Sequence, residues 1–116
     1  MNITIIEDTE LEALYLHEIL SNDGIEATVF VDSREGLEAV ISEKPNLVFL
    51  DLHMPGIDGF EACKKLKTLK ETSHIPIIII TASTRKEYLI QAFNVGADDF
   101  ITKPLQDYTS VQNKFE

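Results

Sequence analysis

The sequence predicts an α/β protein: a single doubly wound, five-stranded parallel sheet in a (βα)5 arrangement. Two observations lead to this prediction. Short runs of β-branched and aliphatic residues alternate with longer amphipathic stretches along the chain. The runs lack polar alternation, which is typical of strands that are buried on both faces of a parallel sheet. The chain has 116 residues, which is the length of one ordinary domain.

Five short apolar runs are the predicted strands. In chain order they cover residues 3–6, 27–31, 47–50, 77–80 and 100–101. Isoleucine, valine and phenylalanine dominate them, and these side chains favour the pleated, buried surface of a sheet. The long intervals between the runs leave room for the crossover helices that parallel strands require.

Helix-forming segments lie between the predicted strands, and three of them begin with the spacing of a capping box or a close relative of it. The paired residues are Thr9 and Glu12, Asp58 and Glu61, and Thr84 and Glu87. Gly96 is suited to the end of the fourth helix. A weaker apolar pattern over residues 105–115 predicts a short fifth helix.

Apolar residues at helical spacing give each predicted helix a core-facing side. The residues expected to face the core are Leu11, Leu14, Tyr15 and Ile19 in the first helix, Leu37, Val40 and Ile41 in the second, Phe60, Cys63 and Leu66 in the third, and Leu89, Ala92 and Phe93 in the fourth.

Charge, apolar run length and cysteine content together disfavour several partners and locations. The chain has 20 acidic and 10 basic residues and a net charge of -10, which disfavours binding to nucleic acid or to an anionic membrane. No Lys or Arg precedes Arg34, so the start lacks the basic region of a secretory signal. The longest aliphatic run, residues 77–80, is far too short to cross a bilayer. Cys63 is the single cysteine, which excludes an internal disulfide. We therefore expect a cytoplasmic protein.

Polar residues follow four of the five predicted strands at their carboxyl ends. They are Glu7 and Asp8 after the first strand, Asp51 after the third, Thr81 after the fourth and Lys103 after the fifth. Ligands of open α/β sheets bind beyond these ends, so we expect the five side chains to lie together. The second strand has no such residue before Asp32, which suits an edge strand far from the site.

This set of side chains suits phosphoryl chemistry. Three crowded carboxylates repel one another, and a hard divalent cation such as Mg²⁺ would relieve that repulsion. Lys103 adds a fixed positive charge and Thr81 a hydroxyl donor, so the group could hold a phosphoryl group while one carboxylate acts as the nucleophile. Asp51 is the expected nucleophile, because the central strand would deliver it into the middle of the group.

Four segments of the chain resemble the receiver domains of two-component response regulators. They are the acidic pair Glu7 and Asp8, residues 47–59, residues 81–83 and residues 96–104. The resemblance covers essentially the whole chain, residues 1–116, with matching order and intervals. It implies a flavodoxin-like fold with strand order 2-1-3-4-5. It also implies a phosphorylation-controlled switch, and not an enzyme that acts on other molecules.

The resemblance implies a role for each acidic residue. Asp51 would accept a phosphoryl group from a sensor histidine kinase, a phosphotransfer protein or a small phosphodonor. The side chains of Asp8 and Asp51 and the main-chain carbonyl of His53 would bind Mg²⁺, and Glu7 would act on the ion through water.

The resemblance also implies how a switch would operate. Thr81 and Lys103 would bind the phosphoryl oxygens, and Phe100 would move inward with Thr81 on activation. This movement would change the face formed by the fourth helix, fifth strand and fifth helix, which would control an output domain or a separate protein partner. The bond between Lys103 and Pro104 is expected to be cis.

Two other functions stay open on the sequence. A haloacid-dehalogenase-type phosphatase also uses an Asp nucleophile, Mg²⁺, Thr and Lys, but it requires a second Asp two residues after the nucleophile, where this chain has His53. A receiver-like interaction module that is never phosphorylated is the other alternative, and the complete set of acids, Thr81 and Lys103 counts against it. Both a stand-alone receiver and a receiver cut from a longer regulator, kinase or cyclase are compatible with the sequence.

Overall fold

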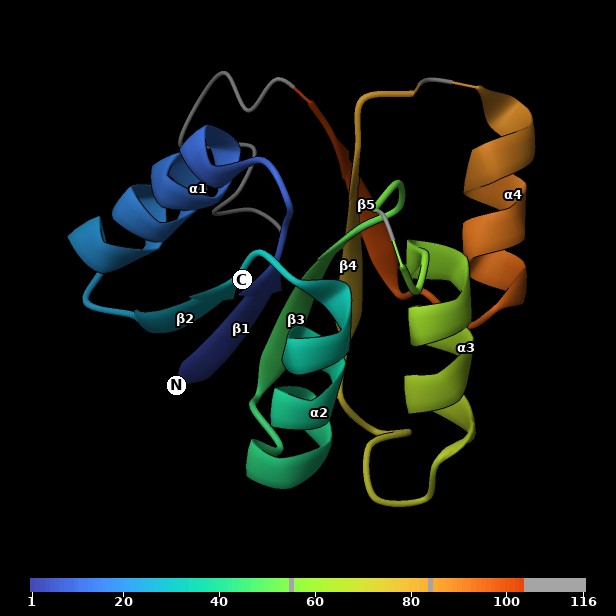
Figure 1. Cartoon of the computed structure of the whole chain (residues 1–116), viewed down its shortest axis with the longest axis horizontal. Helices are drawn as coiled ribbons and strands as arrows, with labels where there is room; N and C mark the ends of the chain where they lie inside the picture. Colours follow the sequence, from blue (N-terminus) through green and yellow to red (C-terminus); the bar gives the residue numbers. More distant parts are fainter. Residues whose placement is uncertain (55, 84, 104–116) are drawn as a thin grey trace.

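The computed structural model describes residues 1–54, 56–83 and 85–103, in which parallel strands alternate with helices (Figure 1). The strands are β1 (Asn2–Ile6), β2 (Glu26–Phe30), β3 (Leu47–Asp51), β4 (Ile77–Thr81) and β5 (Asp99–Thr102). The helices are α1 (Glu10–Asn22), α2 (Ser33–Glu43), α3 (Gly59–Thr68) and α4 (Lys86–Asn94). All five predicted strands are confirmed. The predicted fifth helix and Pro104 lie outside the described residues.

The strands form one parallel sheet in the order β2-β1-β3-β4-β5, which confirms the predicted topology. β1 and β3 are therefore neighbours, with Ile6 beside Leu50, although β2 separates them in the chain. Because all the pairs are parallel, the carboxyl ends of the strands meet at one edge of the sheet. β2 is an edge strand, as its lack of polar end residues suggested.

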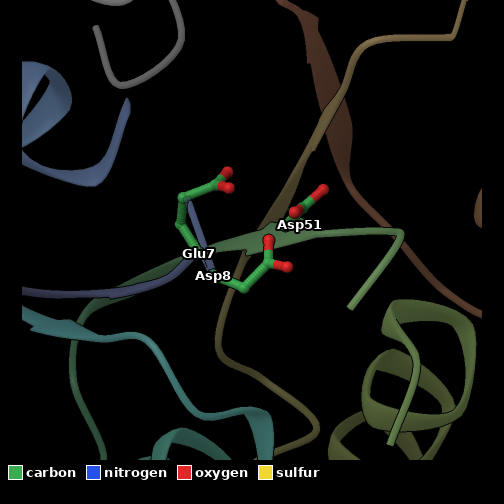
Figure 2. A group of neighbouring side chains, drawn as sticks. All are labelled: Glu7, Asp8 and Asp51. Atoms are coloured by element: carbon green, nitrogen blue, oxygen red, sulfur yellow. The ribbon is translucent and has the colours of Figure 1, made fainter. Parts of the chain in front are cut away.

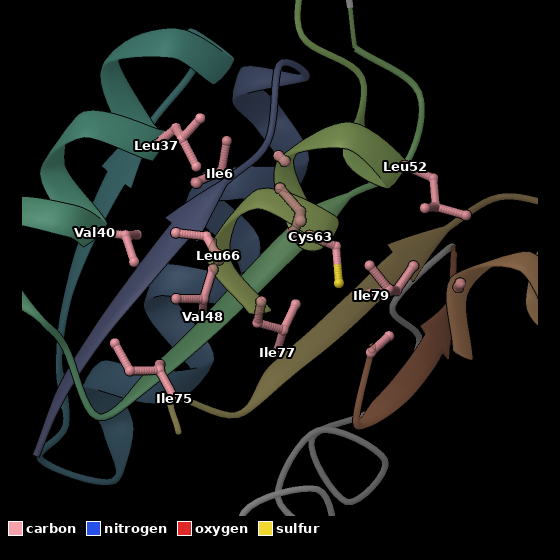
Figure 3. Close-up of a cluster of buried hydrophobic side chains, with 14 of the residues drawn as sticks. Ile6, Leu37, Val40, Val48, Leu52, Cys63, Leu66, Ile75, Ile77 and Ile79 are labelled. Carbon is pink, nitrogen blue, oxygen red and sulfur yellow. The ribbon is translucent and has the colours of Figure 1, made fainter. Parts of the chain in front are cut away.

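Helices cover both faces of the sheet, so the fold is doubly wound. Figure 3 shows the core between the sheet and α2 and α3, where Leu37 and Val40 of α2 and Cys63 and Leu66 of α3 meet the strands. A second core lies under α1. Neighbouring residues of β3 alternate between the two cores: Val48 and Leu50 belong to the first, and Leu47 and Phe49 to the second.

The predicted core face of α1 is wrong except for Ile19. Leu11, Leu14 and Tyr15 are exposed, and the buried residues are Ala13, Leu16, Ile19 and Leu20. Apolar residues surround much of this helix, so two stripes of helical spacing compete. The sheet packs against the stripe centred on Leu16. Phe93 of α4 is likewise exposed, whereas the neighbouring Ala92 is buried as predicted.

Only part of the predicted helix capping is present. Asp58 caps α3 as expected, and its carboxylate accepts a hydrogen bond of 2.9 Å from a main-chain amide of the first turn. Thr9 precedes α1, but its side chain makes no capping hydrogen bond among the described residues. Thr84 lies outside them, and α4 follows Arg85 without a side-chain cap. Asp32, which the sequence pattern missed, caps α2 through two main-chain amides.

Gly59 fixes the start of α3 against the end of β3. Its amide donates a hydrogen bond of 2.9 Å to the carbonyl of Leu52. A Cβ atom at this position would collide with the main chain of Asp51 and Leu52. The absence of a side chain therefore allows α3 to begin directly beside the strand end that carries Asp51. No helix in the described part of the chain is long and apolar enough to span a membrane.

Candidate functional site

Three carboxylates lie together beyond the carboxyl ends of β1 and β3 (Figure 2). Oxygen atoms of Glu7, Asp8 and Asp51 all lie within 4.8 Å of one another. Glu7 and Asp51 are buried, whereas Asp8 is exposed. The pairing of β1 with β3 brings these residues together from distant parts of the chain. The predicted acidic group is confirmed.

The surroundings of Asp51 disfavour its charged form. Burial raises the pKa of Asp51 from 3.8 to about 7, and the charge of Glu7 adds to the rise while Lys103 opposes it. The main-chain amide of His53 lies 3.4 Å from Oδ1 of Asp51 and donates a hydrogen bond to it. A further positive charge nearby would therefore stabilise the ionised form of Asp51.

Lys103 supplies part of the positive charge that the acids need. Its Nζ atom lies 3.4 Å from Oδ2 of Asp51 and 2.9 Å from Oε2 of Glu7. Its shortest ion pair, 2.7 Å, is with Oε2 of Glu12 in the first turn of α1. Burial lowers the pKa of Lys103, but the bonds with Glu12 and Glu7 and the charge of Asp51 outweigh it and raise the pKa above its ordinary value. Lys103 therefore offsets part of the negative charge of these acids.

Sequence reasoning missed Glu12 as a member of this site. The residue was assigned only to a capping box with Thr9, because both stand at a helix start. Its ion partner, Lys103, lies near the other end of the chain. The available signal was its position one helical turn after Asp8, which places another acid close to the same strand end.

Glu7 has a second contact that ties the site to α1. Its Oε1 atom accepts a hydrogen bond of 3.1 Å from the main-chain amide of Thr9 and one of 3.0 Å from Nζ of Lys103. The capping-box spacing predicts that the side chain of Thr9 caps α1, but that side chain makes no capping hydrogen bond among the described residues. The structure gives Glu7 two tasks, since its Oε1 atom accepts a hydrogen bond from the amide of Thr9 and another from Lys103.

Thr81 and Lys103 are placed side by side by the pairing of β4 with β5. Thr81 ends β4, is fully buried, and accepts a hydrogen bond of 2.7 Å from the amide of Lys103 through its carbonyl. Its hydroxyl accepts a hydrogen bond of 3.0 Å from the amide of Ser83. Both residues therefore lie at the same edge of the sheet as the acids.

Phe100 lies in β5 on the side of α4. Its ring is partly buried and packs edge to face against Phe93, with the ring centroids 6.0 Å apart. The position connects the strand that leads to Lys103 with the exposed surface of α4.

The three acidic groups suit a hard divalent cation. Carboxylate oxygens are the ligands that Mg²⁺ prefers, and the spacing allows them to share one ion. The exposed position of Asp8 gives such an ion access from solvent. The raised pKa of Asp51 is a second sign that the group can accommodate more positive charge.

Comparisons with known proteins match nearly the whole chain. The family model described as "Response regulator receiver domain" matches residues 3–113. The response regulator PleD of Caulobacter vibrioides is 36% identical over 105 residues, which are 90% of this chain and 23% of PleD. Protein PilH of Pseudomonas aeruginosa is 33% identical over 107 residues, which are 92% of this chain and 88% of PilH.

A solved structure has the same fold. The crystal structure of a putative response regulator from Chloroflexus aurantiacus superposes with a TM-score of 0.91 and 27% identity, covering 97% of this chain and 93% of that chain. The chain spans only part of several curated relatives, including 23% of PleD and 43% of the regulatory protein RprY of Bacteroides fragilis. Both the sequence and the fold lead to one assignment: the chain belongs to the receiver domains of two-component response regulators.

Proposed function

We propose that Asp51 is the phosphoacceptor of this receiver domain and that residues 1–116 act as one phosphorylation-controlled switch. The observation that carries the proposal is the position of Asp51. It ends the central strand, is buried, and lies close to the acids Glu7 and Asp8 and to the ammonium group of Lys103. The family assignment favours this function over a haloacid-dehalogenase-type phosphatase.

The proposed reaction moves one phosphoryl group. A carboxylate oxygen of Asp51 attacks phosphorus and forms the new O–P bond. The bond to the imidazole nitrogen of a sensor histidine kinase or phosphotransfer protein breaks, and that nitrogen keeps the electron pair. With acetyl phosphate as a small donor, the leaving group is acetate. The domain thus catalyses only its own phosphorylation and later hydrolysis.

Lys103 and Thr81 stabilise the charge of the transferred group in this proposal. The ammonium group of Lys103 already lies 3.4 Å from Asp51, so it can also reach an oxygen of the attached phosphoryl group. The hydroxyl of Thr81 offers a donor at the same edge. A preorganised ammonium and hydroxyl lower the cost of the negative charge that develops during transfer.

The residues that would hold Mg²⁺ are Asp8, Asp51 and the carbonyl of His53, with Glu7 acting through water. When bound, the ion supplies positive charge to the phosphoryl oxygens. The ion pair of Glu7 with Lys103 fits a less direct part for Glu7, since this carboxylate already has a cationic partner.

The switch proposal uses Thr81 and Phe100. A phosphoryl group on Asp51 would draw the hydroxyl of Thr81 toward it, and Phe100 would follow inward. Because Phe100 packs on Phe93, this movement would alter the surface of α4 and β5. An output domain or a protein partner would read this surface in the cytoplasm, without binding of nucleic acid by this domain.

Intact-mass spectrometry after incubation with acetyl phosphate and Mg²⁺ tests the proposal. We expect the wild type to gain one phosphoryl group, Asp51→Asn to gain none, and the exposed control Asp23→Asn to gain one. A gain in Asp51→Asn would refute the acceptor assignment. No gain in the wild type, with acetyl phosphate and with a panel of histidine kinases, would favour an interaction module that is never phosphorylated.

A further inference from the structure

The ammonium group of Lys103 lies closer to Glu12 and Glu7 than to Asp51, the proposed phosphoacceptor. Its Nζ atom lies 2.7 Å from Glu12, 2.9 Å from Glu7 and 3.4 Å from Asp51. The Oε2 atoms of Glu7 and Glu12 are buried from solvent, and within the described part of the chain Lys103 is the cation that pairs with both.

The distances distinguish two close partners from one loose partner. Charge-assisted N–H···O bonds are typically about 2.7 to 2.9 Å long. The ion pairs with Oε2 of Glu7 and Oε2 of Glu12 are this short, although neither oxygen accepts a hydrogen bond among the described residues, whereas the ion pair with Asp51 is longer. Lys103 is thus held toward β1 and α1, and a phosphoryl group on Asp51 would have to draw it away.

Glu7 and Glu12 differ in how easily they could release Lys103. The side chain of Glu7 is 1% exposed, so loss of its cation would leave a buried charge without compensation. The side chain of Glu12 is 36% exposed and can turn into solvent at low cost. Glu12 is therefore the carboxylate that can give up the ammonium group.

We propose that Glu12 is a positioning residue that holds Lys103 in the unphosphorylated protein and releases it when Asp51 carries a phosphoryl group. This inference rests on the proposed function of Asp51. The phosphoryl group adds negative charge beside Nζ and competes with Glu12 for it. Glu12 thereby opposes phosphorylation, and release of Glu12 connects the phosphorylation state to the first turn of α1.

Three variants separate this pairing from a general effect of charge. Glu12→Gln keeps the shape of the side chain and removes its charge. Glu12→Asp keeps the charge on a side chain that is one methylene shorter. Glu10→Gln is the matched control, because Glu10 is an exposed acid in the same first turn of α1.

The first measurement is the rate of phosphorylation by acetyl phosphate at fixed pH and Mg²⁺ concentration. We expect Glu12→Gln and Glu12→Asp to react about fivefold faster than the wild type or more, and Glu10→Gln to react at the wild-type rate. Equal rates in Glu12→Gln and Glu10→Gln, or a slower rate in Glu12→Gln, would overturn the proposal. If Glu12→Asp reacted at the wild-type rate, the faster reaction of Glu12→Gln would be due to its lost charge alone. That result would also overturn the proposal.

The second measurement does not need a phosphoryl group. Heteronuclear NMR of the lysine ammonium groups reports the surroundings of Nζ in the metal-free protein. We expect Glu12→Gln to shift the Lys103 signal and Glu10→Gln to leave it in place, and an unshifted signal in Glu12→Gln would refute the resting pair. If the wild type takes no phosphoryl group, the proposed function and the release step both fail, while this comparison still decides whether the pair exists.

Discussion

The imidazole ring of His53 lies edge-on against the phenol ring of Tyr88, with centroids 5.1 Å apart and planes at 71°. His53 lies two residues after Asp51, and Tyr88 belongs to α4, so the contact connects the segment that follows β3 to that helix. The guanidinium group of Arg85 also contacts Tyr88 and lies 4.9 Å from the centre of its ring. The position of the His53 ring therefore depends on α4.

We predict that His53→Gly speeds the loss of the phosphoryl group severalfold, which is about 1 kcal/mol in barrier height. His53 lies two residues after Asp51, so its bulky ring would shield one side of the path by which water attacks the phosphoryl group. Tyr88→Ala should also speed the loss of the phosphoryl group, because it removes the ring that contacts His53. Ser83→Ala should change this rate less. The measurement is the decay of phosphoprotein after removal of the donor, at fixed Mg²⁺ concentration and pH.

Tyr15→Ala is the control for this experiment, since Tyr15 is an exposed tyrosine on α1. If Tyr88 acts through His53, the variant that combines His53→Gly with Tyr88→Ala should lose its phosphoryl group no faster than His53→Gly alone. A slower decay in His53→Gly would show that the ring assists the water, and the shielding account would be wrong.

The stability of the metal-free protein should fall with rising pH because of Asp51. Its pKa is about 7 in the folded chain against 3.8 ordinarily, so folding favours the protonated form. The stabilising contribution is complete below pH 3.8 and is lost as the pH rises through about 7. In metal-free buffer at alkaline pH, Asp51→Asn should melt about 5 °C above the wild type. Thermal melts at a series of pH values check this, and a lower melting temperature for Asp51→Asn would contradict it.

Mg²⁺ should raise the melting temperature of the wild type in a saturable manner, because it binds the folded cluster and not the unfolded chain. The increase should be larger above pH 7 than below it, since the ion requires ionised Asp51, whose pKa is about 7. Asp8→Asn should lose most of the increase, and Asp23→Asn should retain it. An equal increase in Asp8→Asn and the wild type would place the ion elsewhere.

Lys103→Ala should fold but with lower stability, by about 3 kcal/mol in the free energy of unfolding. The physical reason is the buried carboxylate of Glu7, which is 1% exposed and would lose its cation. Adding Glu7→Gln to Lys103→Ala should recover part of the loss. Urea denaturation provides the measurement, with the exposed Lys64→Ala as the control. If the double variant were less stable than Lys103→Ala, uncompensated charge on Glu7 would not be the cause.

The strands and their order were predictable because a strand buried on both faces needs apolar residues at every position. β3 and β4 meet this condition along almost their full length, and their sequences show it directly. The face of α1 was not predictable in the same way. Leu11 and Leu14 lie on one stripe and Leu16 and Leu20 on another, and only packing against the sheet selects between them.

The site was predictable to the extent that its residues follow strands. Glu7, Asp8 and Asp51 come directly after or at the end of β1 and β3, so the sheet alone brings them together. Glu12 lies on a helix, and its part in the site depends on how the long side chain of Lys103 bends toward α1. No spacing in the sequence encodes that contact, because its two partners lie near opposite ends of the chain.

The strand order divides the site between two halves of the chain. The three acids lie at or just after the ends of β1 and β3, whereas Thr81 and Lys103 lie at or just after the ends of β4 and β5, which follow α3. The segment between α3 and β4 includes the exposed residues Glu71, Ser73 and His74. A break there would yield two fragments, one with the proposed acceptor Asp51 and one with Thr81 and Lys103. Aspartyl phosphate formation would then report reassembly of the fragments, which makes this receiver a candidate split-protein sensor.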